Sequence, residues 1–201
     1  MSKVLCAMAA AVVLTWFHVA SVSAQSAAMF STRFGSAATR VAIGVIEGRT
    51  YIVEQRTSDG RCERQQISAE TKLTNVVLFF SGDGANHIRV VEGSNTWEST
   101  LCGWRITPIT ARTHSLQIRA GGGSDVAIVT KLGDIDGQGG NDLIIADDTS
   151  WTVFGGDGDD CLIQPTGFGA NGALTGNAGN DILCDLGDGS VLYGCSGSDQ
   201  Y

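Results

Sequence analysis

The chain has 201 residues, enough for one or two small domains, and a formal net charge of −8. The charge is unevenly placed, because from Ala120 onward there are 13 aspartates, no glutamate and a single base, Lys131. Such an acidic half argues against nucleic acid as a partner and suits cations. High charge also favours disorder, but regularly placed Ile, Leu and Val residues in this half count against disorder.

The first 24 residues have the features of an export signal. Lys3 gives a positive start, the stretch from Val4 to Val19 is nearly all apolar, and small residues lead up to Ala24. A membrane anchor is the alternative, but the stretch is short for a span and contains His18. We therefore expect cleavage after Ala24 and no stable membrane span after it. The expected location is secreted or extracellular, with the periplasm or the cell surface as alternatives.

Residues 25–119 carry strand signals. "RVAIGVIEGRTYIVEQ" and "NVVLFF" are rich in β-branched and aromatic residues, and "GWRITPI" and "HSLQIRA" indicate two further strands. The Asp-Gly pair in "TSDGRC" predicts a hairpin between Tyr51 and Ile67. We expect a β cap over residues 25–74, since a repetitive structure needs atypical ends, and degenerate repeats over residues 75–119.

Five cysteines follow the signal, and an exported chain meets an oxidising compartment, so at least one disulfide is expected. Cys62 with Cys102 is the expected pair, because both lie in the first half. The odd number leaves a thiol that is free or that pairs between chains.

No catalytic motif occurs in the sequence. There is no H-E-x-x-H and no G-x-S-x-G, and only His87 and His114 follow the signal. Trp97, Trp104 and Trp151 could stack on a sugar, or could be ordinary strand aromatics. We therefore expect that the protein is not an enzyme.

A nine-residue pattern, G-G-x-G-x-D-x-U-x with U a large apolar residue, recurs from Ala120 onward. "GGDGDDCLI", from Gly155 to Ile163, fits it fully, and a degenerate copy, "SGDGANHIR", has Asn86 at position six. The strong copy returns about every 18 residues, so each period holds two short loop-and-strand units. The sixth positions of the strong copies are Asp125, Asp142, Asp160, Asp181 and Asp199.

The period of two in a strand predicts that the middle residue of each unit points inward. Two facing rows result. One is Ile88, Ala127, Ile144, Leu162 and Leu183, and the other is Phe79, Ile118, Ile135, Val153, Leu174 and Leu192.

These repeats resemble the haemolysin-type calcium-binding (RTX) nonapeptide repeats. The resemblance covers residues 120–201 well and extends weakly to about residue 75. It implies an all-β fold, a right-handed parallel β-roll or β-solenoid, with a degenerate or capping β region at the N-terminus. It also implies that calcium ions lie between stacked loops.

Calcium takes six to eight oxygen ligands, so two stacked loops are needed to enclose one ion. The resemblance implies that the position-six aspartate is the main side-chain ligand and that the glycine loops supply carbonyl oxygens. Only one side of the roll keeps the aspartates, which predicts a single row of ions. The alternative is that these aspartates are ordinary turn residues. The expected metal-binding residues are Asp125, Gly137, Gly139, Asp142, Gly155, Gly156, Asp157, Gly158, Asp160, Gly176, Gly179, Asp181, Gly194, Gly197 and Asp199.

The expected function is that of an exported calcium-binding protein, a structural or binding module outside the cytoplasm. Its expected partners are calcium ions and cell-surface or polysaccharide ligands. The alternative is a secreted hydrolase, carbohydrate- or peptide-directed, with its site in residues 25–119. The last repeat stops at its eighth position, and such an open edge predicts end-to-end self-association.

Overall fold

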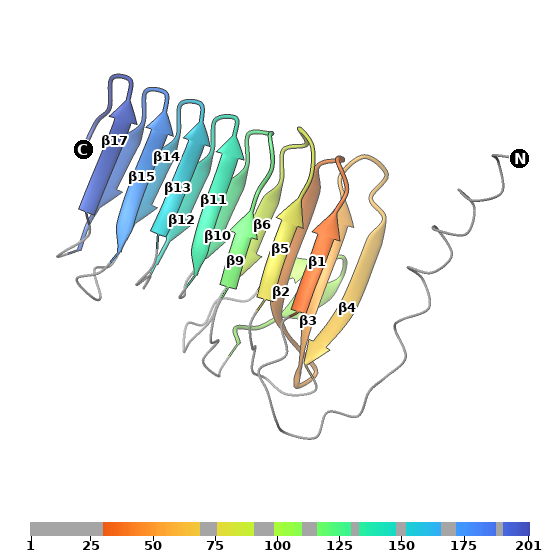
Figure 1. The fold of residues 1–201 in the computed structure, drawn as a ribbon. Helices are drawn as coiled ribbons and strands as arrows, with labels where there is room; N and C mark the ends of the chain where they lie inside the picture. The colour runs from red at the N-terminus through yellow and green to blue at the C-terminus, as the bar shows by residue number, and fades with distance from the viewer. Residues whose placement is uncertain are drawn as a thin grey trace, which may run out of the picture.

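The computed structural model describes residues 30–68, 76–90, 99–109, 116–129, 133–147, 152–165, 172–187 and 191–201. The regular structure of these residues is entirely β (Figure 1). None of their segments is a helix that could cross a membrane. The expected export signal, together with His114, Trp97 and Trp151, lies outside the described residues.

Two large sheets face each other, and successive strands of the repeats alternate between them (Figure 1). Sheet A has the order β1 (Phe30–Phe34), β5 (Val76–Phe80), β9 (Leu116–Arg119), β11 (Asp134–Gly139), β13 (Thr152–Asp157), β15 (Ala173–Ala178) and β17 (Val191–Ser196). Sheet B has the order β16 (Ile182–Asp185), β14 (Cys161–Gln164), β12 (Leu143–Ala146), β10 (Val126–Val129), β6 (His87–Val90), β2 (Thr39–Ile46), β3 (Arg49–Arg56) and β4 (Cys62–Ser68).

The repeats stack in layers, where a layer is one strand of sheet A, the loop after it and the next strand of sheet B. All neighbouring strands in sheet A are parallel, and so are those of sheet B from β2 to β16. The glycine-rich loops therefore all lie at one edge of the two sheets, the upper edge in Figure 1. Parallel pairing begins with β1 and β2, which pair with β5 and β6.

The core lies between the two sheets, and one expected inward row is confirmed. Ile88, Ala127, Ile144, Leu162 and Leu183 are each 2% exposed or less. Ile118, Ile135, Val153 and Leu174 of the other row are also buried, while Leu192 on the last strand of sheet A is partly buried. The alternation of strand residues thus places the core as the sequence predicts.

The prediction for Phe79 is wrong. Leu78 is the inward residue, since it pairs with Ile118 and is fully buried, whereas Phe79 pairs with Arg119 on the outer face. Its ring lies between the guanidinium groups of Arg33 and Arg119, each 5.7 Å from its centroid. The cause is an extra loop residue: Phe79 aligns with Arg119 and His87 with Val126, so the degenerate loop is one residue longer than the next.

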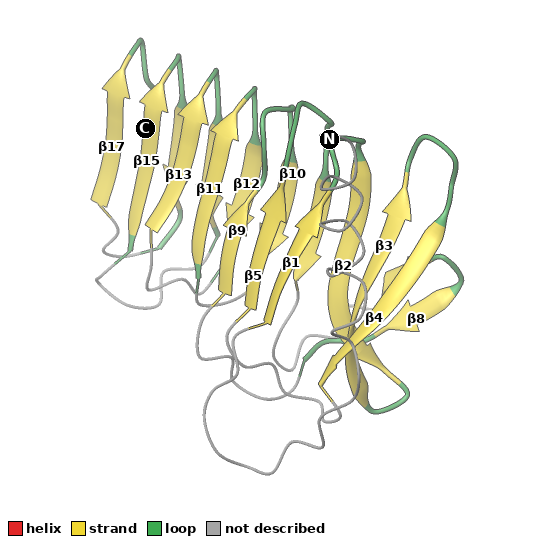
Figure 2. Ribbon diagram, turned by 45° about the vertical axis from the view of Figure 1, so that its right-hand side comes forward, coloured by secondary structure: helices red, strands yellow, loops and turns green. Residues whose placement is uncertain are grey.

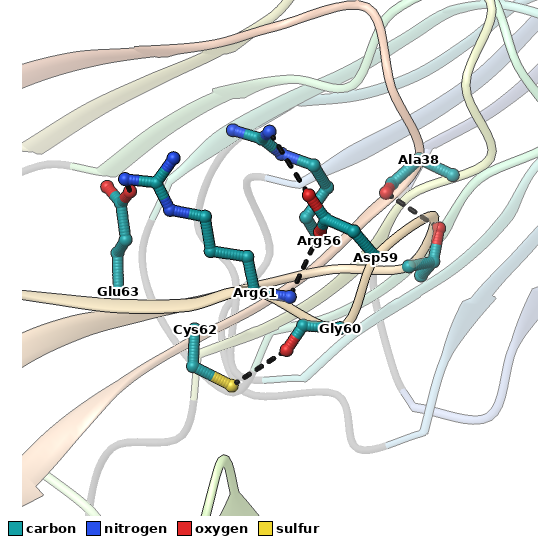
Figure 3. A network of polar contacts seen from close by, with 8 residues as sticks. Ala38, Arg56, Asp59, Gly60, Arg61, Cys62 and Glu63 are labelled. Carbon is teal, nitrogen blue, oxygen red and sulfur yellow. Dashed lines mark hydrogen bonds and ion pairs between the residues drawn. The ribbon is translucent and has the colours of Figure 1, made fainter.

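The N-terminal part of sheet B is antiparallel, and the predicted Tyr51–Ile67 hairpin is confirmed as β3 and β4. Its turn is closed by backbone hydrogen bonds from Arg56 N to the carbonyl oxygen of Arg61 and from Gly60 N to the carbonyl oxygen of Arg56, both 2.9 Å. The N–H of Arg61 also donates to Asp59 Oδ1 at 3.0 Å (Figure 3). This use of an Asp-Gly pair follows the usual chemistry of tight hairpin turns.

A small hairpin, β7 (Ser99–Leu101) and β8 (Trp104–Ile106), packs against the outer face of β2 and β3 (Figure 2). Its Ile106 forms a second apolar cluster with Ala42, Ile46 and Val53. The predicted disulfide between Cys62 and Cys102 is confirmed, and it joins β4 to the turn of this hairpin. Outer-face apolar residues of β2 and β3 are thereby covered.

Candidate metal site in the glycine loops

The side chains at position six form a continuous hydrogen-bonded row along the loops. In each case the backbone N–H of one layer donates to a side-chain oxygen of the next layer. The row starts where Thr39 N donates to Asn86 Oδ1 at 3.2 Å. It continues from Asn86 to Asp125 (2.6 Å), Asp125 to Asp142 (2.8 Å), Asp142 to Asp160 (2.8 Å), Asp160 to Asp181 (2.9 Å) and Asp181 to Asp199 (3.1 Å).

The second carboxylate oxygen of four of these aspartates has no hydrogen-bond partner. Oδ2 of Asp125, Asp142, Asp160 and Asp181 is buried, and each of these residues is 2% exposed or less. A buried acceptor without a donor is costly, and more so if it carries charge. The row therefore leaves each of these Oδ2 atoms available to a hydrogen-bond donor or a cation.

The first glycine of each loop makes the space that Oδ2 occupies. A Cβ at Gly137, Gly155 or Gly176 would overlap Oδ2 of the aspartate five residues later. The Cβ of Gly137 would also overlap the carbonyl oxygen of Gly155 in the next layer. A carboxylate oxygen and a carbonyl oxygen, both acceptors, thus face the same small volume.

The degenerate layer reveals which chemistry this volume requires. Asn86 occupies position six there, and its Nδ2 donates to the carbonyl oxygen of Ala120, in position one of the next layer, at 2.9 Å. In the layers that carry aspartate, the corresponding atom is an oxygen that cannot donate unless it is protonated. A cation, a proton on the carboxyl group or another donor would therefore take the place of the donor that Asn86 provides.

Burial raises the pKa of these carboxyls. It raises the pKa of Asp125 to about 6 and the pKa values of Asp142 and Asp160 to about 7. The pKa of Asp181 is raised too, first by burial and then by the charges of Asp199 and Asp159. The hydrogen bonds from the neighbouring backbone oppose these shifts only in part. Ionised carboxylates in this row are therefore unfavourable without a compensating charge.

In the last four strong copies, glycine at position four is required by both conformation and packing. Gly140, Gly158, Gly179 and Gly197 all have positive φ, between 110° and 144°. A Cβ at Gly158 would overlap the carbonyl oxygen of Gly140 in the layer before. Layers can stack at this spacing only because these residues lack a side chain.

Position two also has positive φ in every strong copy, but it is less strict. Gly121 and Gly156 occupy it in two loops, with φ of 109° and 119°. Gln138, Asn177 and Cys195 occupy it in the others, with φ of 75–77°. This explains how copies that lack the second glycine still build the same loop, at some cost in strain.

A second row, which the sequence reasoning missed, runs along position five in the opposite sense. Asn141 N donates to Ser124 Oγ at 3.3 Å, and Asp159 N donates to Asn141 Oδ1 at 3.0 Å. Asn180 N donates to Asp159 Oδ1 at 2.8 Å, and Ser198 N donates to Asn180 Oδ1 at 3.0 Å. The available signal was that position five is always Ser, Asn or Asp in the strong copies.

The other predicted metal residues divide into two groups. Gly139 ends strand β11, Gly194 lies in strand β17 and Gly197 lies in the bend after β17, and Asp199 ends the position-six row in a partly buried position. Asp157, at position three, is exposed and lies apart from the buried row. Within the described ranges, no point gathers three His, Cys, Asp or Glu side chains, so an ion between layers would need backbone carbonyls as well.

The fold and the loops define an all-β protein of stacked parallel strands with a row of buried carboxylates along one edge. No family model, curated protein or solved structure matches the chain.

Proposed function

We propose that the chain is an exported calcium-binding protein that acts as a structural or binding module outside the cytoplasm. One observation carries the proposal: four successive buried Oδ2 atoms lack a partner, and the carbonyl oxygen of Gly155 faces the same volume as Oδ2 of Asp142. Carboxylate and carbonyl oxygens are the ligands that a hard cation such as calcium prefers.

We further propose that the fold is a right-handed parallel β-roll related to the RTX repeats. The parallel pairing of every second strand and the return of the loop about every 18 residues support this. Right-handed connections between parallel strands are the general rule in proteins.

The ligands proposed for the ions are Oδ2 of Asp125, Asp142, Asp160 and Asp181, with carbonyl oxygens of the glycine loops such as that of Gly155. When bound, calcium supplies the positive charge that these carboxylates lack. The residues of the chain do the rest: the position-six N–H groups orient each carboxylate through Oδ1, and the position-one glycines leave room for Oδ2. Ion binding then adds to the free energy of folding.

Export is supported by the Cys62–Cys102 disulfide, which fits an oxidising compartment. Mass spectrometry of protein secreted by its host should give a mature N-terminus at Gln25. Full-length protein retained in the membrane fraction would contradict export by cleavage.

Calcium binding is tested on the full chain by equilibrium dialysis and by far-ultraviolet circular dichroism, in calcium, in magnesium and in chelator. We expect bound calcium and a gain of β signal or thermal stability that magnesium does not reproduce. Asp142→Asn, Asp160→Asn and Asp181→Asn combined should abolish both effects. Asp134→Asn, on strand β11, is the matched control and should abolish neither. Absence of bound calcium in the folded wild type would overturn the proposal.

A further inference from the structure

The outer face of sheet B is apolar over four strands, although it faces away from the core. Its outward side chains lie in two rows that are in register across the strands. One row is Val126, Leu143, Cys161 and Ile182, and the other is Ile128, Ile145, Ile163 and Cys184. Most of these side chains are half-buried, and Ile182 is 46% exposed.

The two rows run parallel to each other across the strands, and the strip between them is called the furrow. Neighbours within a row are about 4.8 Å apart because they lie on adjacent strands, whereas the two rows are about 6.6 Å apart along each strand. The furrow therefore runs perpendicular to the strands, for about 14 Å from β10 to β16.

Basic residues continue both rows at the β10 end of the furrow. Val126 pairs with His87, which pairs with Arg40, and Ile128 pairs with Arg89. These residues line a groove of about 250 Å³, together with Ala42 and with Thr100 and Leu101 of strand β7. Among the described residues, none that lines this groove is acidic. Its volume approaches that of ordinary small-molecule sites, which combine an apolar lining with a few polar groups.

We propose that this groove and furrow bind a single-chain fatty carboxylate, with the head group at Arg40, His87 and Arg89 and the acyl chain in the furrow. The argument is one of complementarity: two arginines and a histidine lie at one end only, and the apolar rows continue from them across four strands. The β7–β8 hairpin packs on the face beside the cationic end and so limits the approach of a flat bilayer there. Burial of each methylene against the two rows supplies affinity, and the guanidinium groups fix the orientation.

The test is isothermal titration calorimetry of the full chain, folded in calcium-containing buffer, with decanoate as the probe. Decanoate should bind with one site per chain, and hexanoate should bind at least about tenfold more weakly because it buries fewer methylenes. Decanol, which lacks the carboxylate, should also bind more weakly. Saturable binding that is insensitive to both chain length and head group would overturn the proposal.

Variants separate the two ends of the site. Arg40→Glu should weaken decanoate binding by about tenfold or more, and Ile145→Asp, in the middle of the furrow, should do the same. Thr175→Asp on the outer face of sheet A is the matched control and should bind like the wild type. Ile145→Ser provides a milder version if circular dichroism shows that Ile145→Asp does not fold. If Arg40→Glu and the Ile145 variants bind decanoate as tightly as the wild type, the proposed site is contradicted.

Two other occupants of the face are distinguished in the same experiment. Sedimentation velocity would reveal a dimer, and flotation with vesicles of phosphatidylcholine and phosphatidylglycerol would reveal a membrane-binding face. The proposal would be overturned if the wild type does not bind decanoate and instead forms a dimer or binds vesicles, and if Ile145→Asp abolishes that association.

Discussion

The backbone N–H of Asp142 donates a 2.8 Å hydrogen bond to Oδ1 of Asp160, one layer further along the molecule. The same carboxylate leaves its Oδ2 buried and without a donor. The Asp160 side chain thus joins two layers and at the same time leaves a buried oxygen without a partner. The stability of the stack should therefore depend on the ion, proton or donor group that satisfies this oxygen.

Asp160→Asn should make the loops less dependent on calcium. Asparagine keeps the acceptor for Asp142 N and offers an N–H₂ group, as Asn86 does toward the carbonyl oxygen of Ala120. In chelator the variant should be more stable than the wild type by roughly 1–3 kcal/mol, the usual penalty of an unsatisfied buried group. Urea unfolding in chelator and in calcium measures both effects, and the calcium-induced gain should shrink.

The control for Asp160→Asn is Asp157→Asn, at the exposed position three of the same loop. Its free energy of unfolding should stay within about 0.5 kcal/mol of the wild type in chelator. An Asp160→Asn variant that is less stable than the wild type in chelator would contradict the proposed demand for a donor.

Without calcium, the protein should be more stable at pH 4–5 than at pH 8. Burial raises the pKa values of Asp142 and Asp160 from the ordinary 3.8 to about 7 in the folded chain. Between these values the folded chain holds protons that the unfolded chain has lost, so the free energy of unfolding falls as pH rises and levels off above about 7. Urea unfolding in chelator across this range measures the slope.

Calcium should oppose this loss above pH 7, since the ion replaces the proton. The double variant Asp142→Asn and Asp160→Asn should make the slope in chelator shallower, because two of the four carboxyls with raised pKa values are gone. Wild-type stability that rises between pH 5 and 8 in chelator would contradict the assignment of raised pKa values.

The sequence predicted the repeating part of the fold because two regular signals agree there. Leu162 at position eight and Asp160 at position six each recur in phase, and the strand period then fixes which residues are buried. The register of Phe79 was not predictable in the same way, because a loop one residue longer shifts every outward residue to the inward side.

Other features depend on contacts between segments that are distant in the amino-acid sequence, and local sequence patterns do not predict such contacts. The position-five row is formed by side chains such as Asn141, and such residues ordinarily indicate turns. The sequence therefore did not predict that these side chains accept hydrogen bonds from the neighbouring layer. The covering of β2 by the β7–β8 hairpin depends on packing between segments far apart in sequence, as in the cluster that contains both Ala42 and Ile106. The apolar outer face of sheet B was likewise invisible until the register of β10 to β16 was known.

Gly158→Ala should destabilise the stack strongly. Gly158 has φ of 130°, and a Cβ there would overlap the carbonyl oxygen of Gly140. Strain and overlap with a fixed backbone atom should together cost at least about 2 kcal/mol. Thermal unfolding in calcium measures the effect. Gly35→Ala is the control, since a Cβ at Gly35 meets no atom within 4 Å and φ is not positive. Equal stability of the two variants would show that the layers are not packed this closely.

Removal of the disulfide should destabilise the N-terminal region and leave the acidic repeats intact. The bond between Cys62 and Cys102 closes a loop over a sequence separation of 40 residues and tethers the β7–β8 hairpin. Cys62→Ser with Cys102→Ser should therefore lower the free energy of unfolding by roughly 2–4 kcal/mol. Hydrogen exchange followed by mass spectrometry should show faster exchange in β4, β7 and β8, while β13 to β17 keep their protection. Cys195→Ser removes an exposed free thiol and should change neither quantity. Loss of protection spread equally over β13 to β17 would mean that the hairpin supports the whole stack rather than only the N-terminal part of sheet B.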